Sequence, residues 1–107
     1  MIPLREFHKD DGRSPFGDWY DELDRRVALK VVSYLNRMSS GNFGQCKSLR
    51  GGLHECRIDQ GPGYRVYFGK EGDRLIILLA GGTKKKQQAD IDKARDYWKI
   101  HKNRTNG

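Results

Sequence analysis

The chain has 107 residues, enough for one compact domain and too few for two. Charged residues make up 33% of it and hydrophobic residues 36%, so the core must be thin and the surface strongly charged. The 21 Lys and Arg against 14 Asp and Glu give a net charge of +7. This excess favours a polyanionic partner such as nucleic acid, although an acidic protein partner or charge that serves only solubility fits it as well.

The apolar stretches and the cysteine spacing indicate the cellular compartment of the protein. No stretch approaches the ~20 apolar residues that span a bilayer, and segment 1–13 lacks the apolar region of a signal peptide. Cys46 and Cys56 form no CxxC pair and belong to no zinc-type spacing. We therefore expect one cytoplasmic domain over residues 1–107, with no membrane segment and two reduced thiols.

The N-terminal half predicts a strand followed by two helices. Residues 2–9 read as a short strand. Ser14 and Pro15 are typical of a helix start, and Asp24 can cap a second helix that Gly41 ends. Both helices carry apolar residues at helical spacing: Phe16, Trp19, Tyr20 and Leu23, then Val27, Val31, Leu35 and Met38. The two helices are expected to form a hairpin that packs on a sheet.

The C-terminal half predicts three strands and a helix. Segments 53–59, 64–70 and 74–80 are rich in β-forming residues, and glycine-containing loops separate them. The third is nearly continuous in apolar residues and is expected to be the central strand, ending at Gly81-Gly82. A final helix is expected over residues 88–102, with Ile91, Ala94 and Trp98 on one face and a frayed tail from residue 101 to 107.

This order of elements predicts an α+β domain. A small, twisted antiparallel sheet is backed on one face by the helical hairpin, and a C-terminal helix follows. The other face of the sheet is expected to stay partly open.

Side-chain alternation places a polar cluster on that open face. Glu55 and Arg57 on one strand, and Arg65 and Tyr67 on the next, are expected to point away from the helical hairpin. Two arginines on adjacent strands suit a phosphate, because guanidinium forks match phosphate oxygens. A surface ion pair of either arginine with Glu55, without any function, explains the same residues.

A run of lysines lies close to this cluster. Lys84, Lys85 and Lys86 follow the third strand and either extend the basic face or form a solvated loop. His54 is expected on the helix-covered face as a packed side chain. The sequence contains no Ser-His-Asp, Cys-His or HExxH arrangement and no phosphate loop, so no metal and no nucleotide cofactor is expected.

Four blocks of the sequence together resemble the RelE/ParE toxins. They are LRGGLHECRID at 49–59, GPGYRVYF at 61–68, LLAGGTKK at 78–85 and the segment from Ala89 to Trp98. More narrowly, they are similar to the addiction-module killer proteins, which are related to phage Gp49 and to HigB toxins.

The resemblance implies the toxin of a type II toxin–antitoxin pair that cuts mRNA on the ribosome without a metal. Arg57, Arg65 and Lys84 match positions that act on the scissile phosphate. The neighbouring side chains are then expected to contact the substrate: Lys85, Lys86, Glu55 and Tyr67. Some relatives carry a lysine at the position of Glu55, and Asp90 lies near the place of the general base without a firm match, so no base is assigned.

The resemblance also implies partners and alternatives. The partners are the ribosome, mRNA and a cognate antitoxin, typically a helix-turn-helix protein. The main alternative is a ParE-like inhibitor of DNA gyrase without nuclease activity, and a third is a non-toxic nucleic-acid-binding module. On the nuclease reading, Arg65→Ala is expected to abolish toxicity and to leave the protein folded.

Overall fold

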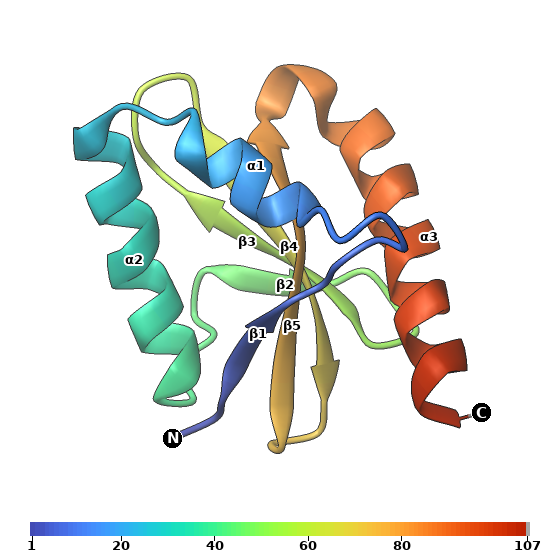
Figure 1. Cartoon of the computed structure of the whole chain (residues 1–107). Helices are drawn as coiled ribbons and strands as arrows, with labels where there is room; N and C mark the ends of the chain where they lie inside the picture. The colour runs from blue at the N-terminus through green and yellow to red at the C-terminus, as the bar shows by residue number, and fades with distance from the viewer. Residues whose placement is uncertain (107) are drawn as a thin grey trace.

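The computed structural model describes residues 1–106 as one α+β domain (Figure 1). The N-terminal half holds β1 (Leu4–Glu6), α1 (Pro15–Asp21) and α2 (Arg25–Ser39). The C-terminal half holds β2 (Cys46–Ser48), β3 (Leu53–Ile58), β4 (Tyr64–Glu71), β5 (Leu75–Thr83), a 3₁₀ turn η1 (Lys84–Lys86) and α3 (Gln87–Asn106).

The five strands form one sheet in the order β1-β5-β4-β3-β2. Neighbouring strands from β2 to β5 are antiparallel, and β1 adds to β5 in parallel. The predicted fold class is confirmed. The expectation that the third apolar strand is central is wrong, because β2 adds an unpredicted edge and leaves β4 in the middle. With only three residues and no apolar alternation, β2 carries no strand signal of its own.

Helices cover both faces of the sheet (Figure 1). On one face, α1 and α2 pack on a core that includes Phe16, Val31 and Phe68. On the other face, α3 places Ala94 and Trp98 against a second core that the sheet completes with Phe7, Leu53, Tyr67, Ile77 and Leu79. The face expected to stay partly open is therefore largely closed by α3.

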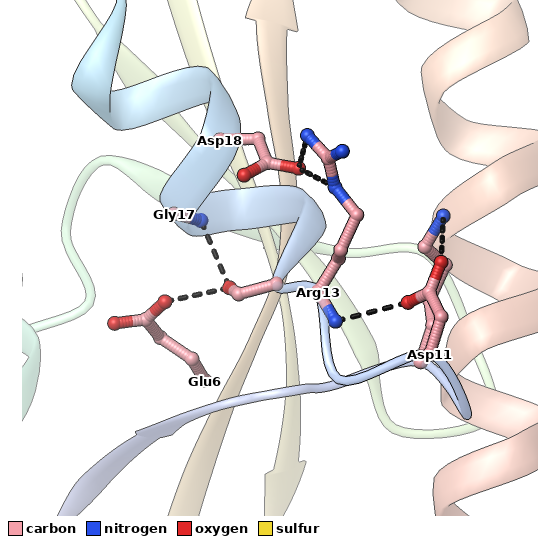
Figure 2. Close-up of polar contacts among 7 residues, drawn as sticks. Glu6, Asp11, Arg13, Gly17 and Asp18 are labelled. Atoms are coloured by element: carbon pink, nitrogen blue, oxygen red, sulfur yellow. Dashed lines mark hydrogen bonds and ion pairs between the residues drawn. The ribbon is translucent and has the colours of Figure 1, made fainter.

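The predicted helix starts are confirmed by their capping contacts. The Ser14 hydroxyl accepts a hydrogen bond from the Gly17 amide at 2.9 Å and donates one to Glu6 at 2.6 Å. Figure 2 shows these contacts, together with the Arg13–Asp18 ion pair whose Nη2 and Oδ2 atoms are 3.0 Å apart. Asp24 caps α2 in the same way, accepting from the Val27 amide at 3.1 Å. Glu6 thus ties the start of α1 to β1.

Gly81 and Gly82 lie within β5, so the expectation that they end the strand is wrong. A Cβ atom at Gly81 would overlap the indole of Trp19 from α1. A Cβ at Gly82, on the opposite face, would overlap the carboxylate of Asp90 from α3. The two glycines are needed because helices approach the strand backbone closely from both sides.

We expect Gly82→Ala to destabilise the fold by about 1–3 kcal/mol, since the new methyl group must displace the first turns of α3. Thermal or urea unfolding measures the change. The double variant Gly82→Ala/Asp90→Ala removes the overlapping carboxylate and should recover most of the loss. Equal destabilisation of the single and double variants would contradict this close approach.

The C-terminal helix is longer than predicted and does not fray at residue 101. The His101 Nε2 atom lies 2.7 Å from Glu71 Oε2, and its ring stacks on Trp98. Arg104 donates to the His8 carbonyl and to Asp10, each at 2.7 Å. These contacts with distant strands and loops hold the last turns in place. Gly107 lies outside the described residues.

Candidate active site

Arg57, Arg65 and Lys84 border one depression of about 420 Å³. The β3–β4 hairpin loop, residues 59–63, forms the rest of its wall. Arg57 and Arg65 are directly opposite in the ladder. The Lys70 amide bonds the Gly52 carbonyl at 2.9 Å, which makes 52/70 a hydrogen-bonded pair and, by alternation, 57/65 a non-hydrogen-bonded one. In such a pair the Cα atoms are about 4.5 Å apart and the side chains lie closest.

The Arg57 side chain is exposed. Its Nε atom lies 3.3 Å from Asp59 Oδ1, and both side chains are about two-thirds exposed. An ion pair this open to water is weak and exchanges readily for another anion. Arg57 is therefore available to a ligand in the depression.

Arg65 is buried, with only 6% of its surface exposed, so its expected place on an open face is wrong. Its Nε atom lies 2.7 Å from Glu55 Oε1, but the N–H is not aimed at that oxygen and makes no hydrogen bond. Its Nη1 atom is buried without a partner as well. Arg65 borders the depression and adds positive charge there, although its Nε and Nη1 atoms are themselves buried.

Glu55 is 3% exposed and lies beside Arg65 as its ion-pair partner, so it too is not on an open face. Gln87 donates to Glu55 Oε1 at 2.7 Å, and Lys47 Nζ lies 3.8 Å from Oε2. Sequence reasoning missed both partners. The place of Glu55 beside Arg65 and Gln87 suits a carboxylate that orients these side chains, and its contact with a substrate stays a prediction.

A second depression of about 290 Å³ continues from this pair toward the edge of the sheet. Arg57 and Arg65 border both hollows, and the side chains that the second adds include Lys47, Gln87 and the acidic Glu55. Together the two make a basic groove across the ends of β2, β3 and β4.

Tyr67 has no exposed surface, which corrects its expected role as a substrate contact. Its hydroxyl group lies buried without a hydrogen-bond partner. Burial, aided by the nearby negative charges of Glu55 and Asp90, raises the pKa of Tyr67 well above its ordinary value, so the phenol stays neutral. Among the residues that the structure describes, all buried side-chain atoms without a hydrogen-bond partner belong to this neighbourhood: atoms of Glu55, Arg65, Tyr67 and Asp90.

Asp90 closes the cluster from α3. Its carboxylate lies over Gly82, the residue paired with Arg65. Burial raises the pKa of Asp90, while Lys93 and Lys86 pull it down.

A raised pKa means that the folded protein binds this proton more tightly than the unfolded chain. The carboxyl group therefore favours the folded state below the ordinary value of 3.8 and opposes it as the pH rises through the folded-state pKa. We expect Asp90→Asn to raise the free energy of unfolding at pH 7, with the gain vanishing toward pH 3.8. Urea unfolding across this range tests it, and a gain independent of pH would contradict the assignment.

The three lysines of η1 are all exposed, but they differ in position. Lys84 borders the depression, and its amide donates to the Gly63 carbonyl at 3.3 Å, which fixes η1 against the hairpin loop. Lys85 and Lys86 do not border either hollow. Lys85 and Lys86 add positive charge near the depression but do not form its wall.

His54 does not join the cluster. It stacks on Phe68 with ring centroids 5.3 Å apart, on the helix-covered side as expected. Burial and the charge of Lys70 lower the pKa of His54. Over residues 1–106, no three His, Cys, Asp or Glu side chains gather as a metal ligand set. Within the same range, no helix is both long and apolar enough to cross a membrane.

A larger groove of about 810 Å³ lies on the other side of the hairpin loop. Its walls combine Asp24, Arg25 and Arg26 with apolar side chains such as Leu29 and Tyr64. Its two arginines are consecutive in the chain and share the wall with apolar side chains, so they attract a phosphate less specifically. The smaller hollow is the better candidate because its cations come from separate strands and converge.

Comparison with known proteins places the chain in a family. Residues 18–99 match the family described as "Phage derived protein Gp49-like (DUF891)". The chain belongs to the Gp49-like family. This matched range contains Glu55, Arg57, Arg65, Lys84 and Asp90, so the whole candidate site lies within the part shared with the family.

A relative in Haemophilus influenzae is similar to the chain over most of its length. It is 42% identical to this Gp49-like chain over 81 residues, which cover 75% of the chain and 82% of the relative, and it is described as an uncharacterized protein.

Proposed function

We propose that this Gp49-like protein is the toxin of a type II toxin–antitoxin system, on the HigB-like side of the RelE/ParE toxins, and that it cuts mRNA on the ribosome. One observation carries the proposal. Arg57, Arg65 and Lys84, from three separate chain segments, border one depression, and the side chain of Arg65 is held there by the buried carboxylate of Glu55. Such a site suits a phosphate of a nucleic-acid backbone.

The cations supply the chemistry that cleavage by a ribose 2′-OH needs. Attack of the 2′ oxygen on the adjacent phosphorus forms a 2′,3′-cyclic phosphate and releases the 5′ oxygen of the next nucleotide. Negative charge builds up on the phosphate oxygens during this step, and fixed guanidinium groups stabilise it without reorganisation. Arg65, held by Glu55, is the fixed cation, and the exposed Arg57 closes on the phosphate as its Asp59 contact opens.

Lys84 borders the depression, and its backbone amide is bonded to Gly63 of the hairpin loop. Its ammonium group is free to approach the leaving 5′ oxygen or a phosphate oxygen. No general base is assigned, because Glu55 is bound to Arg65 and Asp90 lies over Gly82 beneath the pocket.

The basic groove also supports the proposed partners. An open groove holds RNA only loosely. The ribosome would therefore do most of the positioning of the scissile bond. With a net charge of +7, the protein fits an acidic antitoxin surface that covers the groove or prevents entry to the ribosome in the cytoplasm.

Inducible expression in a bacterial host tests the function. After induction, primer extension on abundant mRNAs should reveal cleavage within coding regions that stops when translation initiation is blocked. Intact mRNA together with DNA damage would instead support a gyrase inhibitor. The absence of growth arrest would leave only a nucleic-acid-binding module.

A further inference from the structure

Cys46 and Cys56 lie directly opposite each other on β2 and β3. The Arg57 amide bonds the Gln45 carbonyl at 3.0 Å, and the Leu49 amide bonds the Leu53 carbonyl at 2.8 Å. By alternation, the pair 46/56 between them is a non-hydrogen-bonded pair, with Cα atoms about 4.5 Å apart. This separation lies inside the range of roughly 4.4–6.8 Å that a disulfide spans without movement of the backbone.

The two thiols are free and unequal. Cys56 is 2% exposed and faces Cys46 directly across the two strands. The neighbouring Cys56 thiol lowers the pKa of Cys46, while the neighbouring Cys46 and burial raise the pKa of Cys56. Cys46 is only half-buried, so it is both the more acidic and the more accessible sulfur of the pair.

We propose that Cys46 and Cys56 are a reversible redox site that forms an intramolecular disulfide by exchange with a small-molecule disulfide such as oxidised glutathione. The Cys46 thiolate attacks one sulfur of glutathione disulfide, which forms a mixed disulfide and releases one glutathione thiolate. Cys56 then gives up its proton to solvent, and its sulfur attacks Cys46 and expels the second glutathione. Two protein thiols are oxidised, one glutathione disulfide is reduced to two thiols, and excess reduced glutathione reverses both steps.

The bond would act on the wall of the basic groove. β2 is a three-residue strand at the edge of the sheet, where local opening is easiest. Lys47 follows Cys46 in the chain, and Glu55 precedes Cys56. The two residues face each other across β2 and β3 as an ion pair. A disulfide would fix β2 against β3 beside the Glu55–Arg65 pair. The redox chemistry does not depend on the proposed nuclease activity.

The test uses the full-length protein in buffers with graded ratios of reduced to oxidised glutathione. After acid quenching and alkylation, intact mass should change from a doubly alkylated protein to one that accepts no alkyl group and has lost two hydrogens. Peptide mapping should join the segments that carry Cys46 and Cys56. Cys56→Ser should stop at an adduct with one glutathione on Cys46, and Cys46→Ser should lose the intramolecular disulfide completely.

Two outcomes on the wild-type protein overturn the proposal, whatever the variants do. One is the recovery of both free thiols after prolonged exposure to glutathione disulfide alone, with circular dichroism showing a folded protein. The other is a product that stays at the mixed disulfide or links two chains. Neither outcome bears on RNA cleavage, so the redox site and the proposed function fail separately.

Discussion

Arg57→Ala is expected to reduce the rate of RNA cleavage by about 10²–10³-fold, the loss typical of removing one donor that stabilises developing negative charge. The protein should remain as stable as the wild type to within ~1 kcal/mol, because Arg57 is exposed and its like-charged cross-strand neighbour gains from its removal. Growth arrest on induction and cleavage of ribosome-bound mRNA by the purified protein measure the first effect, and urea unfolding measures the second.

Arg74→Ala is the matched control for this variant. Arg74 is an exposed arginine in the turn before β5, outside both hollows, and its removal changes the net charge equally. It should retain nearly full activity. Equal losses in both variants would mean that overall charge, rather than the depression, drives the activity.

Arg65→Ala is expected to have the larger total effect, with loss of cleavage and a decrease of about 3–5 kcal/mol in the free energy of unfolding. The reason is that the carboxylate of Glu55 stays buried at 3% exposure without its cation. The burial of this pair therefore adds an expected loss of stability to the sequence-based prediction that the variant folds but is inactive. Urea unfolding with circular dichroism and the same cleavage assay measure both quantities.

Two further variants separate stability from function at Arg65. Glu55→Ala/Arg65→Ala removes both charges and should recover much of the lost stability while staying inactive. Arg65→Lys keeps the charge but lacks the planar fork, so it should fold while cleaving more slowly. An Arg65→Ala protein as stable as the wild type would show that the pair is not buried in solution.

Local sequence signals predicted much of the architecture. Ser14 and Asp24 mark the helix starts because capping depends on residues within one turn. Period-2 alternation placed His54 on the helix-covered face, where it stacks on Phe68. The same alternation placed Arg57 and Arg65 on one face, and the structure adds that they are direct cross-strand neighbours with Lys84 at the same depression.

Long-range packing could not be predicted in this way. Nothing in the strands indicates that α3 covers the face that carries Glu55, Arg65 and Tyr67, so these side chains were expected to be exposed. The indole of Trp98 fits over Gly69, where a Cβ would overlap it, and only the folded chain brings the two together. Gln87 was missed because a glutamine after a lysine run carries no signal for a bond with Glu55.

The most direct measurement uses purified protein, ribosomes and a short mRNA positioned for translation. Wild-type protein should cut the mRNA once per programmed ribosome and leave a cyclic phosphate end, whereas Arg57→Ala should leave the mRNA intact over the same time. Equal cutting by both proteins, or no cutting by the wild type on any programmed ribosome, would contradict an RNA phosphate site formed by Arg57, Arg65 and Lys84.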